Sequence, residues 1–315
     1  MTEYPLESNG RVDETYRMIS HHKADDTGPV VVAIAGMHGN ENYGIAALRQ
    51  IDELFVKGSG ISNGEWIGVA ANVKALYERV RYIDEDMNRI WFPSIIDKIR
   101  RTDESKLKSN ERVEIKMLLN VLDPYLQDKK REIIFVDLHS FSAPGGLFVI
   151  TPRRERNIVK LSGLSVPLIF GIDDALQGTA LRYFHDQGHI SIAFEGGQHH
   201  DSYTLMNMIA YLLLITERFK LIDTSYIEKF ESYRKQIKKV AGKLPDRVEL
   251  AYQHIIEPGD KFVMKPGFLN FQKIEKGEWL ADDVNGKIVA PCSGFMLMPL
   301  YQKQGNDGFF IVQEL

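Results

Sequence analysis

The sequence is poor in cysteine: Cys292 is the only one in 315 residues. A single cysteine excludes an intramolecular disulfide, and it excludes a closed structural zinc site built mainly from cysteines. Disulfides persist in oxidising compartments, so the cysteine content predicts a protein of a reducing compartment, and by default a cytoplasmic one.

Long apolar runs and a surplus of positive charge are also missing. The most apolar segment, LMNMIAYLLLITERF at 205–219, is shorter than the about 20 residues that span a bilayer. The N-terminal MTEYPLESNG has neither the basic nor the apolar region of a signal peptide. The formal net charge is −4, and no run of Lys and Arg marks a basic, nucleic-acid-binding surface. We therefore expect no membrane and no nucleic-acid partner, whereas homo-oligomerisation is left open.

Short apolar runs alternate with helical stretches over most of the chain. Strands are predicted at 29–36, 65–73, 132–139, 146–151, 167–173 and 190–197, and helices at 42–55, 111–127 and 201–222. Several strands are apolar at successive positions, as in a mostly parallel sheet covered on both faces. This order predicts an α/β fold with flanking helices. The highly charged segment 94–112 is interpreted as an exposed, partly flexible connection.

The sequence pattern changes near AGKLPDR at 241–247, where glycine and proline end a charged helix. Beyond it, turn signals recur about every ten residues, which is typical of a small all-β unit. We therefore predict two domains, 1–245 for the α/β part and 246–315 for a β-rich C-terminal part.

Polar side chains stand where predicted strands end, which is the edge where open α/β sheets bind ligands. The first strand is followed by GMHGNE, with His38 and Glu41, and the third ends in DLHS, with His139. Two imidazoles and one carboxylate are the ligand set of a catalytic zinc with an open fourth position. The three residues therefore predict a zinc site, although HxxE alone is a weak signal and other divalent cations also suit this set.

Further candidates surround this set. Glu195 ends an otherwise apolar strand, where a carboxylate suits a general base for zinc-bound water. Asp137 and Asp86 are candidates to orient the metal-binding histidines. Arg81, Asn88 and Arg89, in RYIDEDMNR, suit recognition of a carboxylate. A charged loop whose arginines pair with its own aspartates would show the same sequence pattern. His199 and His200 are interpreted as loop histidines.

These motifs, in this order, resemble the succinylglutamate desuccinylase/aspartoacylase family, a branch of the zinc carboxypeptidase-like enzymes. The resemblance rests on GMHGNE, RYIDEDMNR, DLHS and FEGG at 194–197, and it continues into PGFLNFQKIEKGEWLA at 266–281. It implies a zinc carboxypeptidase-like scaffold with one Zn²⁺ on His38, Glu41 and His139. It also implies that Glu195 is general base and acid.

The resemblance assigns roles to the remaining candidates. Arg81 would polarise the scissile carbonyl, Asn88 and Arg89 would bind a substrate carboxylate, and Asp86 would orient a zinc-bound histidine. Arg182 is the nearest match to a further substrate-contacting arginine, though its spacing to Glu195 is long for the family. A substrate-contacting tyrosine of the C-terminal domain has no firm match.

The function expected from residues and resemblance together is zinc-dependent hydrolysis of the amide bond of an N-acyl amino acid or a similar small carboxylate. EGGQ at 195–198 and the C-terminal MPLYQKQGNDGFFIV depart from the family pattern, which indicates a divergent branch with its own substrate. Two alternatives stay open: a zinc carboxypeptidase acting on peptides, and a non-catalytic binding protein on the same fold.

Overall fold

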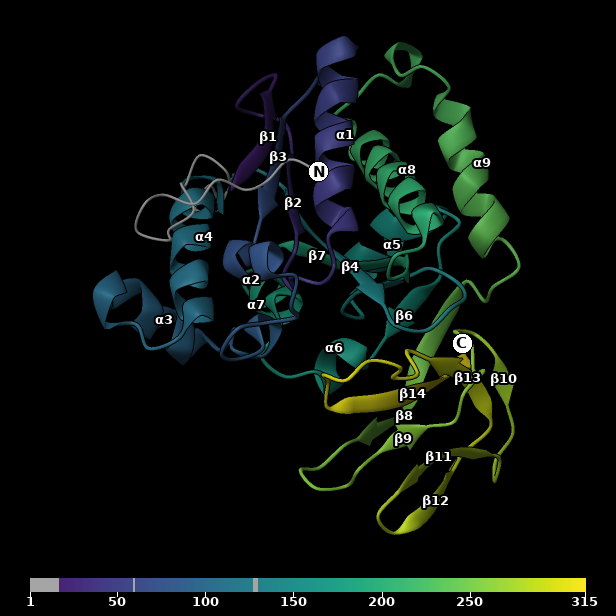
Figure 1. Ribbon diagram of the computed structural model, residues 1–315. Coiled ribbons are helices and arrows are strands. Elements are labelled where there is room, and N and C mark those ends of the chain that lie inside the picture. The colour runs from purple at the N-terminus through teal and green to yellow at the C-terminus, as the bar shows by residue number, and fades with distance from the viewer. Residues whose placement is uncertain (1–16, 59, 127–129) are drawn as a thin grey trace.

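The computed structural model describes residues 17–58, 60–126 and 130–315. The N-terminal MTEYPLESNG, which lacks the regions of a signal peptide, lies outside these ranges. So does residue 127, the last of the helix predicted at 111–127. Figure 1 shows a twisted central sheet with helices on both sides and a group of strands at the C-terminal end.

A mixed sheet of eleven strands forms the centre, in the order β1-β3-β2-β4-β7-β5-β6-β8-β14-β13-β10. Seven of them come from the α/β part of the chain: β1 (Met18–Lys23), β2 (Val30–Ala35), β3 (Glu65–Ala70), β4 (Ile133–Phe141), β5 (Phe148–Ile150), β6 (Leu168–Phe170) and β7 (Ile190–Gln198). Strands β3, β2, β4 and β7 are parallel to one another, whereas β1 and β5 pair antiparallel with β3 and β7. All six predicted strands are present, and the α/β fold class is confirmed.

Helices cover both faces of this sheet because its strands are apolar on both sides. One face packs against α1 (Tyr43–Lys57), α8 (Ser202–Arg218) and α9 (Phe230–Ala241). The other packs against α3 (Pro93–Arg101), α4 (Asn110–Leu126) and α7 (Ala180–Asp186). The remaining helices are α2 (Val73–Glu78), α5 (Glu155–Leu161) and α6 (Ile172–Ala175), with 3₁₀ turns at Met87–Arg89, Glu104–Lys106 and Thr224–Tyr226.

The interpretation of 94–112 as an exposed connection is wrong. Pro93 begins α3, where its fixed φ suits the first turn, and Ile96 and Ile99 on one side of the helix are buried in the core. The charges of α3 lie away from the core on an amphipathic helix, whereas Glu111, at the end of the segment, is buried in α4. Because charge outnumbers these two apolar anchors, composition alone concealed the helix.

The C-terminal strands are β8 (Arg247–Ile255), β9 (Val263–Met264), β10 (Lys273–Ile274), β11 (Trp279–Asp283), β12 (Gly286–Val289), β13 (Gly294–Leu297) and β14 (Asp307–Glu314). Strands β12, β11 and β9 form a separate antiparallel sheet. Strand β8 pairs with β6 on one side and with β14 on the other, so the central sheet runs across the predicted boundary at 245/246. The division into two domains stays a prediction.

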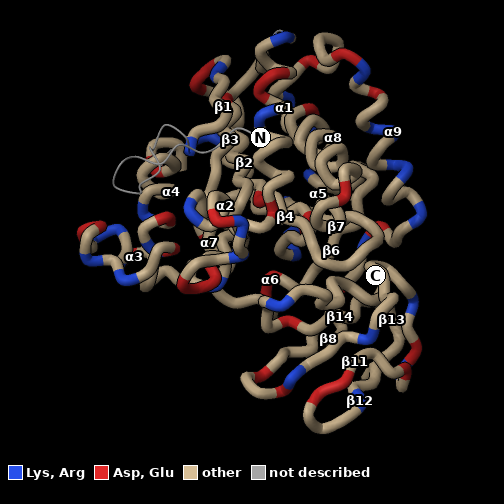
Figure 2. Tube along the Cα trace, viewed as in Figure 1, with Lys and Arg blue, Asp and Glu red and all other residues tan. Residues whose placement is uncertain are grey.

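Charged residues of both signs are interleaved along the chain, in the α/β part and in the C-terminal strands alike (Figure 2). Within the described residues, no helix combines the length and the apolar character needed to cross a bilayer.

Candidate metal centre and active site

The turn after β2 is held by two glycines. Gly36 has φ +71°, a conformation that a residue with a side chain rarely adopts. A Cβ at Gly39 would lie 2.0 Å from the carbonyl carbon of Ala75, so the backbone can approach α2 only without a side chain. This turn places His38 and Glu41 at the carboxyl edge of the sheet, beside His139 of β4.

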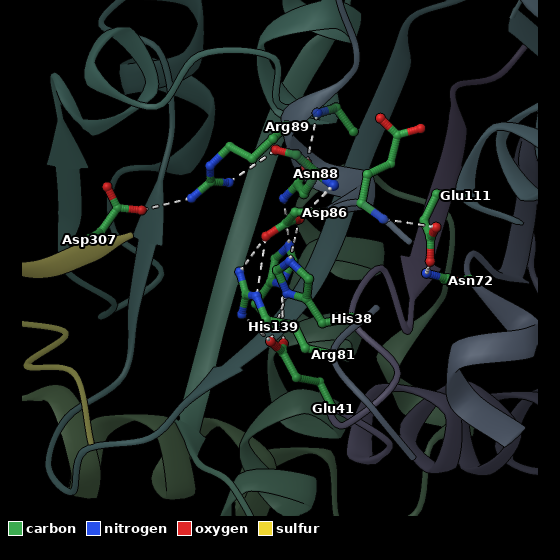
Figure 3. A network of polar contacts seen from close by, with 12 residues as sticks. His38, Glu41, Asn72, Arg81, Asp86, Asn88, Arg89, Glu111, His139 and Asp307 are labelled. Carbon is green, nitrogen blue, oxygen red and sulfur yellow. Dashed lines mark hydrogen bonds and ion pairs between the residues drawn. The ribbon is translucent and has the colours of Figure 1, made fainter. Parts of the chain in front are cut away.

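His38, Glu41 and His139 are buried and lie close together, with potential ligand atoms within 4.8 Å of one another. Nδ1 of His38 is 2.8 Å from Oε1 of Glu41, and Nδ1 of His139 is 3.2 Å from Oε2 (Figure 3). Ser140 fixes the carboxylate by donating its backbone N–H to Oε2 at 2.9 Å. Sequence reasoning grouped these three residues, and the structure brings them together as a group that could hold a metal ion.

Each imidazole has a carboxylate at its outer nitrogen. Nε2 of His38 lies 3.1 Å from Oδ1 of Asp86, and Nε2 of His139 lies 2.9 Å from Oδ2 of Asp137. Metal-binding histidines usually have such a partner, which leaves the other nitrogen directed at the metal. The residues present therefore fit the zinc implied by the resemblance: both Nδ1 atoms and the Glu41 carboxylate converge, and a carboxylate oxygen lies within 3.1 Å of each outer nitrogen.

Glu195 lies beside this group because β7 pairs with β4, with Glu195 opposite His139. Its carboxylate is buried, and Oε2 has no hydrogen-bond partner in the described residues. Burial raises the pKa of the Glu195 carboxyl to about 8, and the negative charges of Glu41 and Asp137 add to this. A carboxyl that titrates near neutrality can both take up and return a proton.

The segment 81–89 contributes three predicted residues. Arg81 donates from Nε and Nη2 to Oδ2 of Asp86, at 3.2 and 3.0 Å, and its Nη1 is 3.8 Å from Glu41. Burial opposes ionisation of Asp86, but the nearby charges of His38 and Arg81 hold its pKa well below the ordinary value. Asp86 also accepts from the backbone N–H of Asn88, which begins the 3₁₀ turn.

Asn88 and Arg89 both line the cavity in front of the metal group. Oδ1 of Asn88 accepts from the backbone N–H of Ala180 at 2.9 Å, which fixes the amide against the start of α7. Arg89 donates from Nη2 to Oδ2 of Asp307, on β14, at 2.8 Å. Asp307 was not predicted, because no local pattern marks an acid in a C-terminal strand as a partner of Arg89.

Glu111 of α4 fixes the backbone of the segment 81–89 through hydrogen bonds. It is fully buried, and its carboxylate accepts from the backbone N–H groups of Ile83, Asp84 and Glu85, at 2.7, 3.1 and 3.2 Å. Figure 3 shows Glu111 on the side of the segment away from His139. Sequence reasoning missed this residue, since an acid at the start of a helix usually indicates only a favourable terminus.

The structure does not bring Arg182 into the cavity. Its guanidinium is paired with Asp174 and Asp186 near the protein surface. No tyrosine is among the described residues that line the cavity. His199, interpreted as a loop histidine, lies close by, with Nδ1 2.8 Å from Oγ of Ser140 and Nε2 3.3 Å from Oε1 of Gln302.

A group that could hold a metal at the edge of an α/β sheet, with a buried carboxyl beside it, is typical of metal-dependent hydrolases. The family model described as the succinylglutamate desuccinylase/aspartoacylase catalytic domain matches residues 27–208, more than half of the chain. The chain therefore belongs to the succinylglutamate desuccinylase/aspartoacylase family, whose members are deacylases. The resemblance inferred from the motifs is confirmed.

Solved structures share the fold. The chain is 14% identical to succinylglutamate desuccinylase/aspartoacylase from Rhodobacter sphaeroides, with a TM-score of 0.67, covering 94% of this chain and 87% of that one. An aspartoacylase family protein from Mesorhizobium loti is 18% identical, with a TM-score of 0.62, and the match covers 94% of this chain and 88% of that one. The product-bound ectoine utilization protein EutE from Ruegeria pomeroyi is 15% identical, with a TM-score of 0.59, and the match covers 93% of this chain and 87% of that one. None of the curated proteins matches the sequence significantly.

Proposed function

We propose that this protein is a zinc-dependent amidohydrolase that cleaves the amide bond of an N-acyl amino acid or a similar small carboxylate. The observation that carries the proposal is the convergence of His38, Glu41 and His139 beside the buried Glu195. A bound zinc ion would lower the pKa of water towards about 7 and polarise a carbonyl oxygen.

The chain's own residues supply the remaining chemistry. Glu195 takes the proton of the attacking water and returns it to the leaving amine, for which its buried carboxyl is suited. Arg81 stabilises the negative charge that develops on the carbonyl oxygen. Asn88 and Arg89 bind the substrate carboxylate, while Asp86 and Asp137 keep the two histidines oriented.

A small substrate is favoured over a peptide by the C-terminal residues at the cavity. Met298, Leu300, Gln302 and Asp307 all line it, so this part of the chain narrows the space in front of the metal group. An enzyme that trims peptides needs an open cleft there.

Two measurements test the proposal. Zinc-loaded protein is assayed by amine release against a panel of N-acyl amino acids and against peptides with a free C-terminus. We expect turnover of the first class only. The isosteric Glu195→Gln variant should keep its zinc and lose about 10²–10⁴-fold in kcat, the usual contribution of general acid–base catalysis. Full activity of this variant with zinc bound would overturn the role of Glu195.

A further inference from the structure

The cavity has two chemically different sides. The metal group, Arg81, Asn88 and Glu195 form the polar side. A second set of lining residues is apolar, and we define it as the apolar wall: Ile150, Ile172, Leu176, Leu181 and Phe310. These five side chains belong to one hydrophobic cluster, and all of the five except Leu176 are buried. The wall is therefore part of the packed core and does not depend on mobile surface side chains.

The apolar wall begins next to the proposed catalytic carboxyl. Ala193 precedes Glu195 by two positions on β7, so both side chains point to the same face of the sheet. Ile150 of β5 is paired with Ala193 in the adjacent strand. One strand repeat of two residues spans roughly 7 Å. An amide bond placed at Glu195 therefore has a substituent within reach of the wall.

The positive charges at the cavity are already matched. Arg81 is paired with Asp86, and Arg89 with Asp307. No lysine and no third arginine is among the described residues that line the cavity. Arg89 can hold one substrate carboxylate by exchanging Asp307 for it. A second carboxylate would be buried without a cation, which is strongly unfavourable.

Asp173, beside the apolar wall, adds a further obstacle to a second carboxylate. It is 3% exposed, and its Oδ1 has no hydrogen-bond partner in the described residues. Nη1 of Arg182 is 4.0 Å from its Oδ2. Together with Asp307, this side chain adds a second acid to the lining of the cavity, which disfavours a further carboxylate there.

We propose that the site selects N-acyl amino acids that carry one carboxylate and an uncharged apolar group seated on the apolar wall, and that it rejects dicarboxylic substrates. This selectivity rests on the proposed function, since it concerns the same site. It names the substrate class, which the metal group alone does not specify.

Shape-matched substrate pairs test the selectivity. N-acetylleucine and N-acetylaspartate differ in charge at the amino-acid side chain, and N-(4-methylpentanoyl)glycine and N-succinylglycine differ in charge at the acyl group. We expect the apolar member to have at least about a 10-fold higher kcat/KM in one pair or both. Absence of a preference in both pairs, or preference for the charged member in either, would overturn the proposal.

Leu176→Lys reverses the chemistry of the wall, and Leu176 is half-buried, so a long side chain can be accommodated. We expect this variant to lower the ratio of kcat/KM for N-acetylleucine to kcat/KM for N-acetylaspartate at least about 10-fold. Leu176→Gln, which removes apolar surface without adding charge, should lower it less. Gln177→Lys adds the same charge at the next, exposed position and should leave the ratio unchanged. An equal effect of both lysine variants would contradict the assignment of the wall.

Calorimetric binding of the same four compounds to zinc-loaded Glu195→Gln protein separates this proposal from the proposed function. If wild-type protein hydrolyses neither these compounds nor any other member of the N-acyl amino acid panel, the proposed function fails. Tighter binding of the apolar members would then still support the selectivity of the wall. Binding of none of them, or tighter binding of the charged members, would overturn the selectivity as well.

Discussion

Arg89 donates a 2.8 Å hydrogen bond to Asp307, a residue 218 positions further along the chain. Asp307 is in turn fixed by Gln253 of β8, which donates to its Oδ1 at 2.7 Å. The arginine predicted to bind a substrate carboxylate thus already has a carboxylate partner, held in place by two C-terminal strands. A substrate carboxylate that Arg89 binds, as proposed, would have to compete with this internal acid.

Removing that competition should change which substrates are accepted. In Asp307→Asn, Arg89 loses its anionic partner and the cavity loses one negative charge. We expect kcat/KM for N-acetylaspartate to rise about 10-fold relative to N-acetylleucine, because a carboxylate near an unpaired guanidinium is stabilised. Steady-state kinetics of both substrates measure this ratio. Glu314→Gln, at an exposed position of the same strand, is the control, and an equal ratio in both variants would contradict the argument.

Glu111 should matter to stability and to substrate binding without contacting the substrate. Glu111→Gln turns an amide NH₂ towards backbone N–H groups that the carboxylate now accepts. We expect a loss of at least about 2 kcal/mol in the free energy of unfolding, measured with urea. A higher KM at unchanged zinc content should accompany it, because segment 81–89 carries Arg81, Asn88 and Arg89. Glu78→Gln, on the exposed end of α2, should stay within about 0.5 kcal/mol of the wild type.

Zinc should stabilise the folded chain through its proposed ligands. A ligand present at 100 times its Kd raises the free energy of unfolding by about 2.7 kcal/mol when it binds only the folded state. Unfolding with zinc and with a chelator measures this gain. Glu41→Gln should lose most of it, whereas Glu195→Gln should keep it. A full gain in the Glu41 variant would exclude that residue as a ligand.

His185 of α7 should make stability depend on pH. Burial, followed by the positive charge of Arg154, lowers its pKa to about 4, and its Nδ1 has no partner in the described residues. An unfolded histidine titrates near 6.5, so the unfolded chain binds one more proton between about pH 6.5 and 4. The folded state should therefore lose stability as pH falls through this range, at up to about 1.4 kcal/mol per pH unit from this group.

The His185→Gln variant isolates that contribution. Its unfolding free energy should fall less between pH 7 and 4.5 than that of the wild type, by roughly 2 kcal/mol. His200→Gln, at an exposed position, serves as the control and should follow the wild-type curve. Parallel curves for all three proteins would show that His185 does not carry the effect.

The sequence predicted the parts of the fold that local patterns encode. Six strands, the helices near 42–55 and 201–222, and the grouping of His38, Glu41 and His139 follow from apolar periodicity and from the meeting of parallel strand ends at one edge. Strand pairing then placed Glu195 opposite His139. Helix α3 was missed because its two buried isoleucines are outnumbered by charges.

The unpredicted features are contacts between distant segments. The contacts of Asp307, of the apolar wall and of Glu111 depend on how distant segments such as β8, β14 and α4 pack. No short sequence motif predicts such packing. Arg182 illustrates the converse: residue type and approximate spacing suggested a substrate contact, whereas its ion pairs with Asp174 and Asp186 direct it elsewhere. Its proposed role in substrate binding gains no support from this placement.

The 218-residue separation between Arg89 and Asp307 also bears on how the protein folds. Contacts between distant segments form slowly, because the entropy of closing a long loop is lost before the contact stabilises anything. We therefore expect β2, β4 and β7 to pair, and to bring the metal group together, before β14 docks. A refolding experiment followed both by zinc binding and by amide hydrolysis should then show metal uptake preceding selective turnover. The delay between the two signals would time the closure of the chain around its substrate.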